Sequence, residues 1–153
     1  MTSRVLKVTV PATAAEVTAR LGEESSHPAH ADDIVSISAT GDGSSQWVLA
    51  FRGGTATWVQ RSRAVQPHRI EFEQVSGQFQ QLSGAWTSTD VPGGAEVVFE
   101  VSYRTSVPHL AGAIDSAIGR VLVRSAHQVI AAIAGPARVT AGGHHLRDLR
   151  AEE

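Results

Sequence analysis

The strongest constraint on the fold of this chain is a change in the period of its hydrophobic pattern. From Ile34 to Thr105, apolar and polar residues alternate, and short clusters of glycine, proline and aspartate interrupt the alternation. After Pro108 the apolar residues recur at helical spacing until Gly135 and Pro136. Alternation is typical of half-buried strands, and short turns between strands permit only antiparallel neighbours. The pattern therefore predicts an antiparallel meander followed by one long helix.

The alternating region divides into six predicted strands, and further elements precede and follow it. The six strands are expected at residues 33–40, 46–51, 55–65, 69–76, 79–89 and 95–105. Before them we expect a strand at 4–10, a short helix at 12–21 and a loop or one helical turn at 22–33. After them, a helix at 109–134 would be about 39 Å long, enough to cross a whole sheet. Residues 136–153 lack a sustained apolar face, so a single domain at 1–135 and a flexible tail are expected.

The predicted fold class is therefore α+β, with a curved seven-stranded antiparallel sheet around the long C-terminal helix. One face of such a sheet must be buried, and only the final helix is long enough to cover it. If the sheet curls incompletely around the helix, a cavity remains between them. The phase of the alternation then predicts which side chains point inward: Trp58, Gln60, Ser62, Ile70, Phe72, Gln74, Leu82, Gly84, Trp86, Val97, Phe99, Val101 and Tyr103.

Two features of this inward set are unusual for a plain core. Gly84 stands in mid-strand, where it packs no side chain, and we interpret it as leaving backbone room for a bend or a ligand. Gln60, Gln74 and Tyr103 are polar groups among aromatic rings, an arrangement typical of a ligand pocket. The aromatic residues alone would also suit an ordinary core, and the amides could simply bond neighbouring strand ends.

Composition excludes several classes of protein. The chain has 153 residues, a formal net charge of −2 and no cysteine, so we expect neither a nucleic-acid surface nor a disulfide framework. It shows no signal-peptide core and no run of 18 apolar residues, which predicts a cytoplasmic protein without stable membrane insertion. A single lysine, Lys7, among many arginines suggests a high-GC, actinobacterial genome.

Most catalytic and metal-binding motifs are missing from the sequence. His27 and His30 could form a metal pair, but Pro28 and the lack of a third ligand favour a surface loop, so no metal is expected. The glycine pairs lie between strands rather than before a helix, which argues against a phosphate loop. The sequence has no nucleophile elbow, no HExxH motif and no Walker motif. We expect no cofactor.

The order of elements resembles the helix-grip domains of the START-like, birch-pollen-allergen-like superfamily, SRPBCC. Within it, residues 56–61, 77–86, 93–103 and 117–122 resemble the polyketide cyclase/dehydrase and coenzyme Q-binding branch. The most specific stretch is G-x-F-x-x-L-x-G-x-W, from Gly77 to Trp86. The resemblance implies an elongated pocket for a hydrophobic or polyketide-like molecule, and a role in bacterial secondary metabolism such as antibiotic biosynthesis.

The resemblance turns the inward set into candidate site residues. Gln74 and Tyr103 are predicted as catalytic groups, and the predicted ligand-binding residues are Trp58, Gln60, Phe72, Leu82, Gly84, Trp86, Phe99, Val101 and Ile118. Aromatases of this branch project an arginine into the pocket, whereas this chain has Glu73 or Gln74 there. Arg61 and Arg63 face outward in the predicted phase, although a bulge could reverse them.

Three functions remain open from the sequence. The first is a cofactor-independent cyclase or dehydratase for a polyketide-like molecule. The second is a non-catalytic carrier or sensor of a lipid or quinone, favoured by the shortage of titratable inward residues. The third is a structural module whose interior is filled by its own side chains. The oligomeric state is also open, with a homodimer among the alternatives.

Overall fold

The computed structural model of the chain describes residues 1–52, 54–105 and 111–143, and these form one sheet with helices on a single side. The elements in chain order are β1 (Thr2–Val10), α1 (Ala14–Leu21), the short 3₁₀ helix η1 (Glu24–Ala29), β2 (Ile34–Ala39), β3 (Ser44–Phe51), β4 (Gly54–Val65), β5 (Arg69–Gly77), β6 (Phe79–Val91), β7 (Gly94–Thr105), α2 (Ala111–Ala134) and β8 (Arg138–Ala141). The α+β helix-grip prediction is confirmed.

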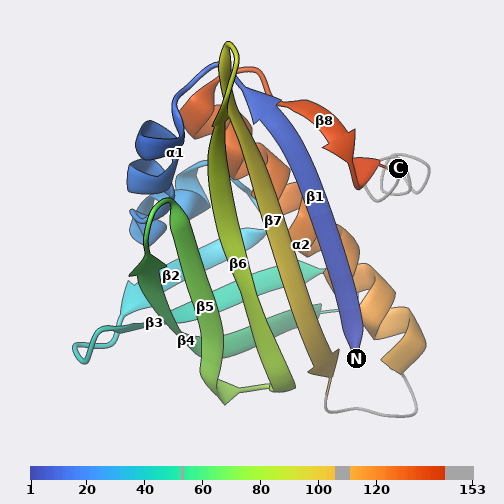
Figure 1. Ribbon diagram of the computed structural model, residues 1–153. Helices are drawn as coiled ribbons and strands as arrows, with labels where there is room; N and C mark the ends of the chain where they lie inside the picture. Colours follow the sequence, from blue (N-terminus) through green and yellow to red (C-terminus); the bar gives the residue numbers. More distant parts are fainter. Residues whose placement is uncertain (53, 106–110, 144–153) are drawn as a thin grey trace.

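The sheet follows the meander expected from the alternation. Its strand order is β2-β3-β4-β5-β6-β7-β1-β8, and all the neighbouring pairs are antiparallel. Figure 1 shows that the sheet bends strongly, so that β2 to β4 run across the direction of β6, β7 and β1. The helix α2 lies along the enclosed side of this bend. The curved sheet and α2 therefore bound a common interior.

The number of strands differs from the prediction. The described residues form eight strands rather than seven, because 138–141 of the expected tail pair with β1. Val139 lies opposite Val8, and the Thr140 hydroxyl donates to the Lys7 carbonyl at 3.2 Å. The free edge of β1 carries backbone donors and acceptors that a returning strand can satisfy. The rest of the predicted tail, 144–153, lies outside the described residues.

The first helix is attached to the sheet at its N-terminus. Thr13 precedes α1, and its side chain accepts a hydrogen bond from the Glu16 amide at 3.2 Å. Asp90, near the end of β6, accepts another from the Ala14 amide at 2.8 Å. These bonds satisfy amides that the helix itself leaves without partners. The first turn of α1 is thereby fixed to the end of β6.

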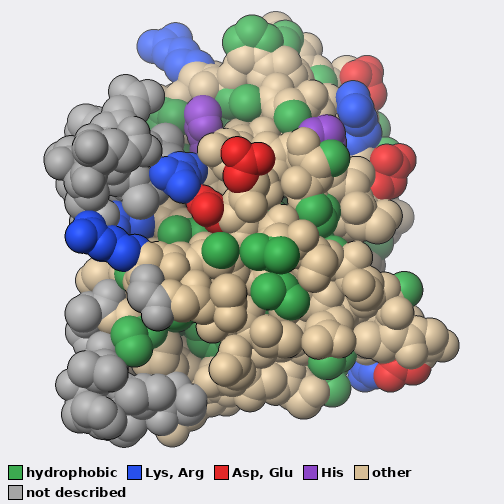
Figure 2. Space-filling view, turned by 180° about the vertical axis from the view of Figure 1, so that it is seen from behind, with side chains coloured by type: hydrophobic (Ala, Val, Ile, Leu, Met, Phe, Trp, Pro, Cys, Tyr) green, Lys and Arg blue, Asp and Glu red, His purple; other side chains and the backbone are tan. Residues whose placement is uncertain are grey.

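The long helix is the core helix of the domain. The segment Ile114–Ala134 is long and apolar enough to cross a membrane by composition alone, but 61% of its most apolar window is buried against the rest of the fold. Its inward residues, among them Ile118, Val121, Val129 and Ile133, join the inward side chains of the sheet in one core. Leu110, the first apolar residue of the helical pattern that follows Pro108, lies outside the described residues. The face of the molecule seen in Figure 2 carries interspersed acidic and basic side chains rather than a field of one sign.

Candidate functional site

An interior cavity lies between the bent sheet and α2. Its volume is about 40 Å³. Aromatic and aliphatic side chains form most of its wall, with three polar residues among them. The lining residues are His27, Ile34, Trp47, Leu49, Trp58, Gln60, Phe72, Leu82, Trp86, Phe99, Val101, Leu122, Ser125, Ala126 and Val129.

The aromatic rings of the lining contact one another in a chain. Trp47 and Trp58 are register partners on β3 and β4, and their rings stack with centroids 5.8 Å apart. On the other side, the rings of Trp86 and Phe99 are 4.6 Å apart, also from paired positions on neighbouring strands. Such contacts add to the stability gained from burial and fix the ring orientations. The cavity therefore has rigid, flat, apolar walls.

A buried hydrogen-bond network fastens η1 to β4 beside the cavity. Gln60 accepts from the Trp58 indole N–H at 3.0 Å and donates through Nε2 to Glu24 at 3.1 Å and to Ser62 at 3.2 Å. The Ser62 hydroxyl donates to the same Glu24 oxygen at 2.7 Å. Burial raises the pKa of the Glu24 carboxyl, and the hydrogen bonds from Ser62 and Gln60 oppose that rise only in part. Glu24 is thus the attachment point of η1.

His27 is part of the wall, and its prediction as a surface-loop residue is wrong. Its side chain is 1% exposed, and its ring makes edge contacts with Trp47 and Trp86 at centroid distances of 6.0 and 6.2 Å. Nε2 lies 3.1 Å from the carbonyl oxygen of Leu21, the last residue of α1. Burial lowers the pKa of His27 to about 4. Pro28 does not force a loop here, because the chain winds as a 3₁₀ turn that directs His27 inward.

Seven of the nine predicted ligand-binding residues line this cavity: Trp58, Gln60, Phe72, Leu82, Trp86, Phe99 and Val101. Ile118 is buried in the core but is not part of the lining. Gly84 is also absent from the lining, because the ring of its register partner Phe72 lies across it. A Cβ at Gly84 would stand 2.5 Å from Phe72 Cζ and 2.3 Å from the Glu100 carbonyl oxygen. The glycine makes room for an aromatic ring of the protein itself.

The two predicted catalytic residues have structural partners away from the cavity. The Gln74 amide donates to the Phe79 carbonyl at 2.9 Å and accepts from the Phe79 amide at 3.2 Å, which closes the β5–β6 hairpin. The Tyr103 hydroxyl donates to the Asp115 carbonyl of α2, and burial raises the pKa of Tyr103. Neither residue is in the cavity lining. Their catalytic roles stay predictions that this geometry does not favour.

Comparison with known proteins assigns the chain to a family. Residues 5–129 match the family described as "Polyketide cyclase / dehydrase and lipid transport". The chain belongs to this family. No curated protein matches it in sequence.

Solved structures show which wider fold this polyketide cyclase family member shares. A protein from Thermus thermophilus has a TM-score of 0.75 and 16% identity, covering 99% of this chain and 100% of that one. The Zhui aromatase/cyclase from Streptomyces sp. R1128 has a TM-score of 0.73 and 16% identity, with 99% and 97% covered. A START superfamily protein from Mycobacterium smegmatis has a TM-score of 0.72 and 12% identity, with 86% and 96% covered. The fold is that of the START-like helix-grip superfamily.

Some lining residues of this family member escaped the sequence analysis. Trp47 and Leu49 alternate in phase on β3, so the same reasoning that selected Trp58 could have found them. Leu122, Ser125 and Val129 recur at three- and four-residue spacing along α2, which is the signal of one helix face. Only His27 carried no usable signal, because its inward direction depends on how α1 ends.

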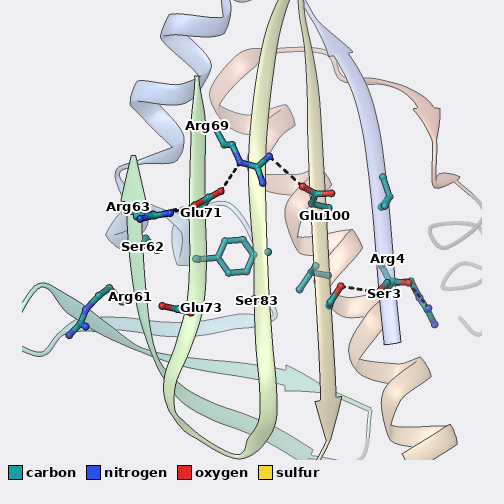
Figure 3. A pocket seen from close by; sticks show the side chains of 15 residues that line it. Ser3, Arg4, Arg61, Ser62, Arg63, Arg69, Glu71, Glu73, Ser83 and Glu100 are labelled. Carbon is teal, nitrogen blue, oxygen red and sulfur yellow. Dashed lines mark hydrogen bonds and ion pairs between the residues drawn. The ribbon is translucent and has the colours of Figure 1, made fainter. Parts of the chain in front are cut away.

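A larger hollow of about 820 Å³ lies on the outer face of the sheet, away from α2 (Figure 3). Glu71 joins Arg63 at 2.7 Å and Arg69 at 3.0 Å, and Arg69 reaches over β6 to Glu100 at 3.4 Å. Arg63 is 76% exposed, so the register shift in β4 near Val59 does not turn it inward. Exposed ion pairs of this kind contribute little stability. We place the candidate site in the interior, because the four charged residues named here already pair with one another.

Proposed function

We propose that the chain binds an apolar, polyketide-type molecule between the sheet and α2 and promotes its cyclisation or dehydration. The observation that carries this proposal is the ring-walled interior cavity with His27, Gln60 and Ser125 among its lining residues. Membership of the polyketide cyclase/dehydrase family supports the same reaction class. A few fixed polar groups among apolar walls are what a small-molecule site requires for orientation.

Binding requires the interior to expand. The cavity of about 40 Å³ is far below the roughly 300–1,000 Å³ of typical ligand sites. The element best placed to open is η1, because it is one short turn whose side-chain attachment to β4 runs through Glu24. Outward movement of η1 would withdraw His27 from between Trp47 and Trp86. We therefore assign η1 as the cover of the site.

The interior suits an aldol-type closure followed by loss of water. In that reaction an α-carbon loses a proton to give an enolate, the enolate carbon bonds to a ketone carbon, and the resulting alkoxide takes up a proton. The β-hydroxyl then leaves as water while the adjacent α-carbon loses a proton, which forms the new C=C bond. Rigid walls such as the stacked Trp47 and Trp58 would hold a flexible chain in a folded conformation. Among the lining residues, the one side chain that titrates near neutral pH in its unperturbed form is His27. A cofactor is not required for this chemistry.

The experiment that tests the proposal compares a blocked interior with an intact one. The protein is incubated with a linear poly-β-ketone thioester, and mass spectrometry follows the loss of water. Ala126→Leu would fill the cavity from α2, whereas Ala132→Leu makes the same change on the exposed side of that helix. We expect product formation with the wild type and Ala132→Leu and its loss with Ala126→Leu. Equal turnover by both variants would place the reaction outside the cavity. If the wild type forms no product, the cyclase is excluded.

A carrier function is the second candidate. The engagement of Gln74 and Tyr103 in structural hydrogen bonds favours it, as does the lipid transport named in the family description. A carrier would release the thioester unchanged after binding it, and only Ala126→Leu would prevent the binding. If neither the wild type nor Ala132→Leu binds any such molecule, the interior is a filled core and the chain is a structural module.

A further inference from the structure

One ring nitrogen of His27 is engaged in a hydrogen bond, and the other is available to a ligand. Nε2 lies 3.1 Å from the Leu21 carbonyl oxygen. A carbonyl oxygen can only accept, so Nε2 carries the proton. In a neutral imidazole the lone pair is then on Nδ1. The ring is neutral at physiological pH, because burial lowers the pKa of His27 to about 4. His27, a lining residue of the cavity, therefore keeps Nδ1 as a hydrogen-bond acceptor, and the bond from Nε2 to Leu21 orients its ring.

Ser125 is a second polar group of the same wall. It lies on α2, it is 3% exposed, and it lines the cavity together with Leu122 and Val129. Its Oγ has no hydrogen-bond partner among the residues that the structure describes. A buried hydroxyl in a helix usually donates to the carbonyl four residues earlier, and this one does not. An unpaired buried hydroxyl is unfavourable unless a bound group satisfies it.

Gln60, the third polar residue of the wall, is already engaged. Its carbonyl oxygen accepts from Trp58, and its amide nitrogen donates to Glu24 and Ser62. Both amide hydrogens are therefore used, and only the second lone pair of its carbonyl oxygen is left to accept a further bond. Gln60 holds Trp58 and η1 in position, and the polar atoms of the wall that have no partner yet among the described residues are His27 Nδ1 and Ser125 Oγ.

Resting on the proposed function, we propose that His27 and Ser125 recognise a single hydroxyl oxygen of the ligand, a phenol or enol on a conjugated ring. The ligand O–H donates to His27 Nδ1, and the same oxygen accepts from the Ser125 hydroxyl. The cavity of about 40 Å³ has room for such an oxygen, since a cavity needs only about 10–15 Å³ to hold one water molecule. The ligand enters while η1 is open, and its ring lies against the Trp47 and Trp58 faces once η1 has closed over it with His27 again facing the interior.

This arrangement discriminates between a hydroxyl and its methyl ether. An ether oxygen can accept from Ser125 but has no proton for Nδ1, and its methyl group adds volume where the cavity is smallest. Sites that hydrogen-bond a ligand hydroxyl reject analogues lacking it, because the buried polar group is then left unpaired. We expect 2-naphthol to bind at least about tenfold more tightly than 2-methoxynaphthalene, which is the ratio for loss of one such bond.

The test is a titration of the ¹⁵N-labelled protein with 2-naphthol and with 2-methoxynaphthalene. The indole N–H resonances of Trp47, Trp58 and Trp86 report binding, since all three line the cavity. The preference for 2-naphthol should disappear in Ser125→Ala and His27→Phe. It should persist in Ser88→Ala, which removes a buried serine hydroxyl outside the lining. Equal binding of both compounds by the wild type, binding of neither, or a preference that survives in both variants would overturn the proposal.

A direct measurement keeps the proposal testable if His27→Phe does not fold. The ¹⁵N resonance of His27 Nδ1 in the wild type should move on addition of 2-naphthol, because accepting a hydrogen bond changes the shielding of a lone-pair nitrogen. It should stay in place with 2-methoxynaphthalene, and identical responses to the two compounds would refute the assignment. The result is separate from catalysis, because a protein that prefers 2-naphthol but forms no cyclised product refutes the cyclase and leaves this recognition intact.

Discussion

Burial of His27 should make the stability of the fold depend on pH in a specific direction. The pKa of this imidazole is lowered from 6.5 to about 4 in the folded chain, chiefly by burial. Between these values the unfolded chain binds a proton that the folded chain does not. The stabilisation is therefore complete above the unfolded pKa and is lost as the pH falls toward the folded pKa.

The size of this contribution to the free energy of unfolding follows from the difference between the two pKa values. At about 1.4 kcal/mol per pKa unit, a lowering from 6.5 to about 4 corresponds to about 3 kcal/mol of unfolding free energy. About 2 kcal/mol of this is lost by about pH 5, and little is lost at about pH 7.5. Glu24 acts in the opposite direction, because its raised pKa makes the folded chain take up a proton more readily in acid.

The assay is urea unfolding at about pH 7.5 and about pH 5, comparing the wild type with His27→Gln. Glutamine can still donate to the Leu21 carbonyl but does not titrate, and the Glu24 contribution is common to both proteins. The wild type should lose about 2 kcal/mol more than the variant over this range. Equal losses, or an NMR titration that places His27 near its unperturbed pKa, would refute the reasoning.

Three further predictions concern the packing of Gly84, the attachment of η1 and the edge of the sheet. Gly84→Ala should lower the unfolding free energy by about 1–3 kcal/mol, because its new Cβ would meet the Glu100 backbone carbonyl, which cannot move aside. The control is Ser83→Ala at the exposed neighbouring position, which should be nearly neutral in the same urea titration. Glu24→Gln should weaken the bonds to Gln60 and Ser62 and therefore speed amide hydrogen exchange in η1. The control Glu23→Gln, at the exposed neighbouring position, should leave the exchange rates unchanged. Similar rates in the two variants would mean that Glu24 does not hold η1. A chain ending at residue 137 should show faster amide exchange in β1 than one ending at residue 143, which keeps β8, and equal exchange would show that β8 does not protect that edge.

The elements of the fold could be predicted from the sequence because their signals are local. Alternation defined β4, β6 and β7 within a few residues of their bounds, and the strand predicted at 4–10 ends where β1 ends, at Val10. The strand β8 was missed because four residues with one partly buried apolar side chain, Val139, carry no periodic signal. Its formation depends on the free edge of β1, a partner more than a hundred residues away in the chain.

The candidate site could be predicted where the phase of a strand alone decides which way a side chain points. That holds for Trp58, Phe72 and Trp86, which all line the cavity. It was not enough for Gln74, whose position near a hairpin offers backbone partners that compete with a role in the interior. The direction of His27 depended on a bond to the Leu21 carbonyl at the end of α1, six residues earlier, and no periodic pattern in the sequence encodes that bond.

The placement of Trp47, Trp58 and Trp86 makes the intrinsic tryptophan fluorescence a reporter of the protein interior. These are all the tryptophans of the chain, and each is at most 9% exposed. Indole emission moves to longer wavelength when water reaches the ring. The wavelength of the emission maximum therefore reports the hydration of the interior, without a contribution from tryptophans at the surface. Opening of η1, entry of a ligand and wetting of the core could therefore be followed in unlabelled protein, in real time and at dilution.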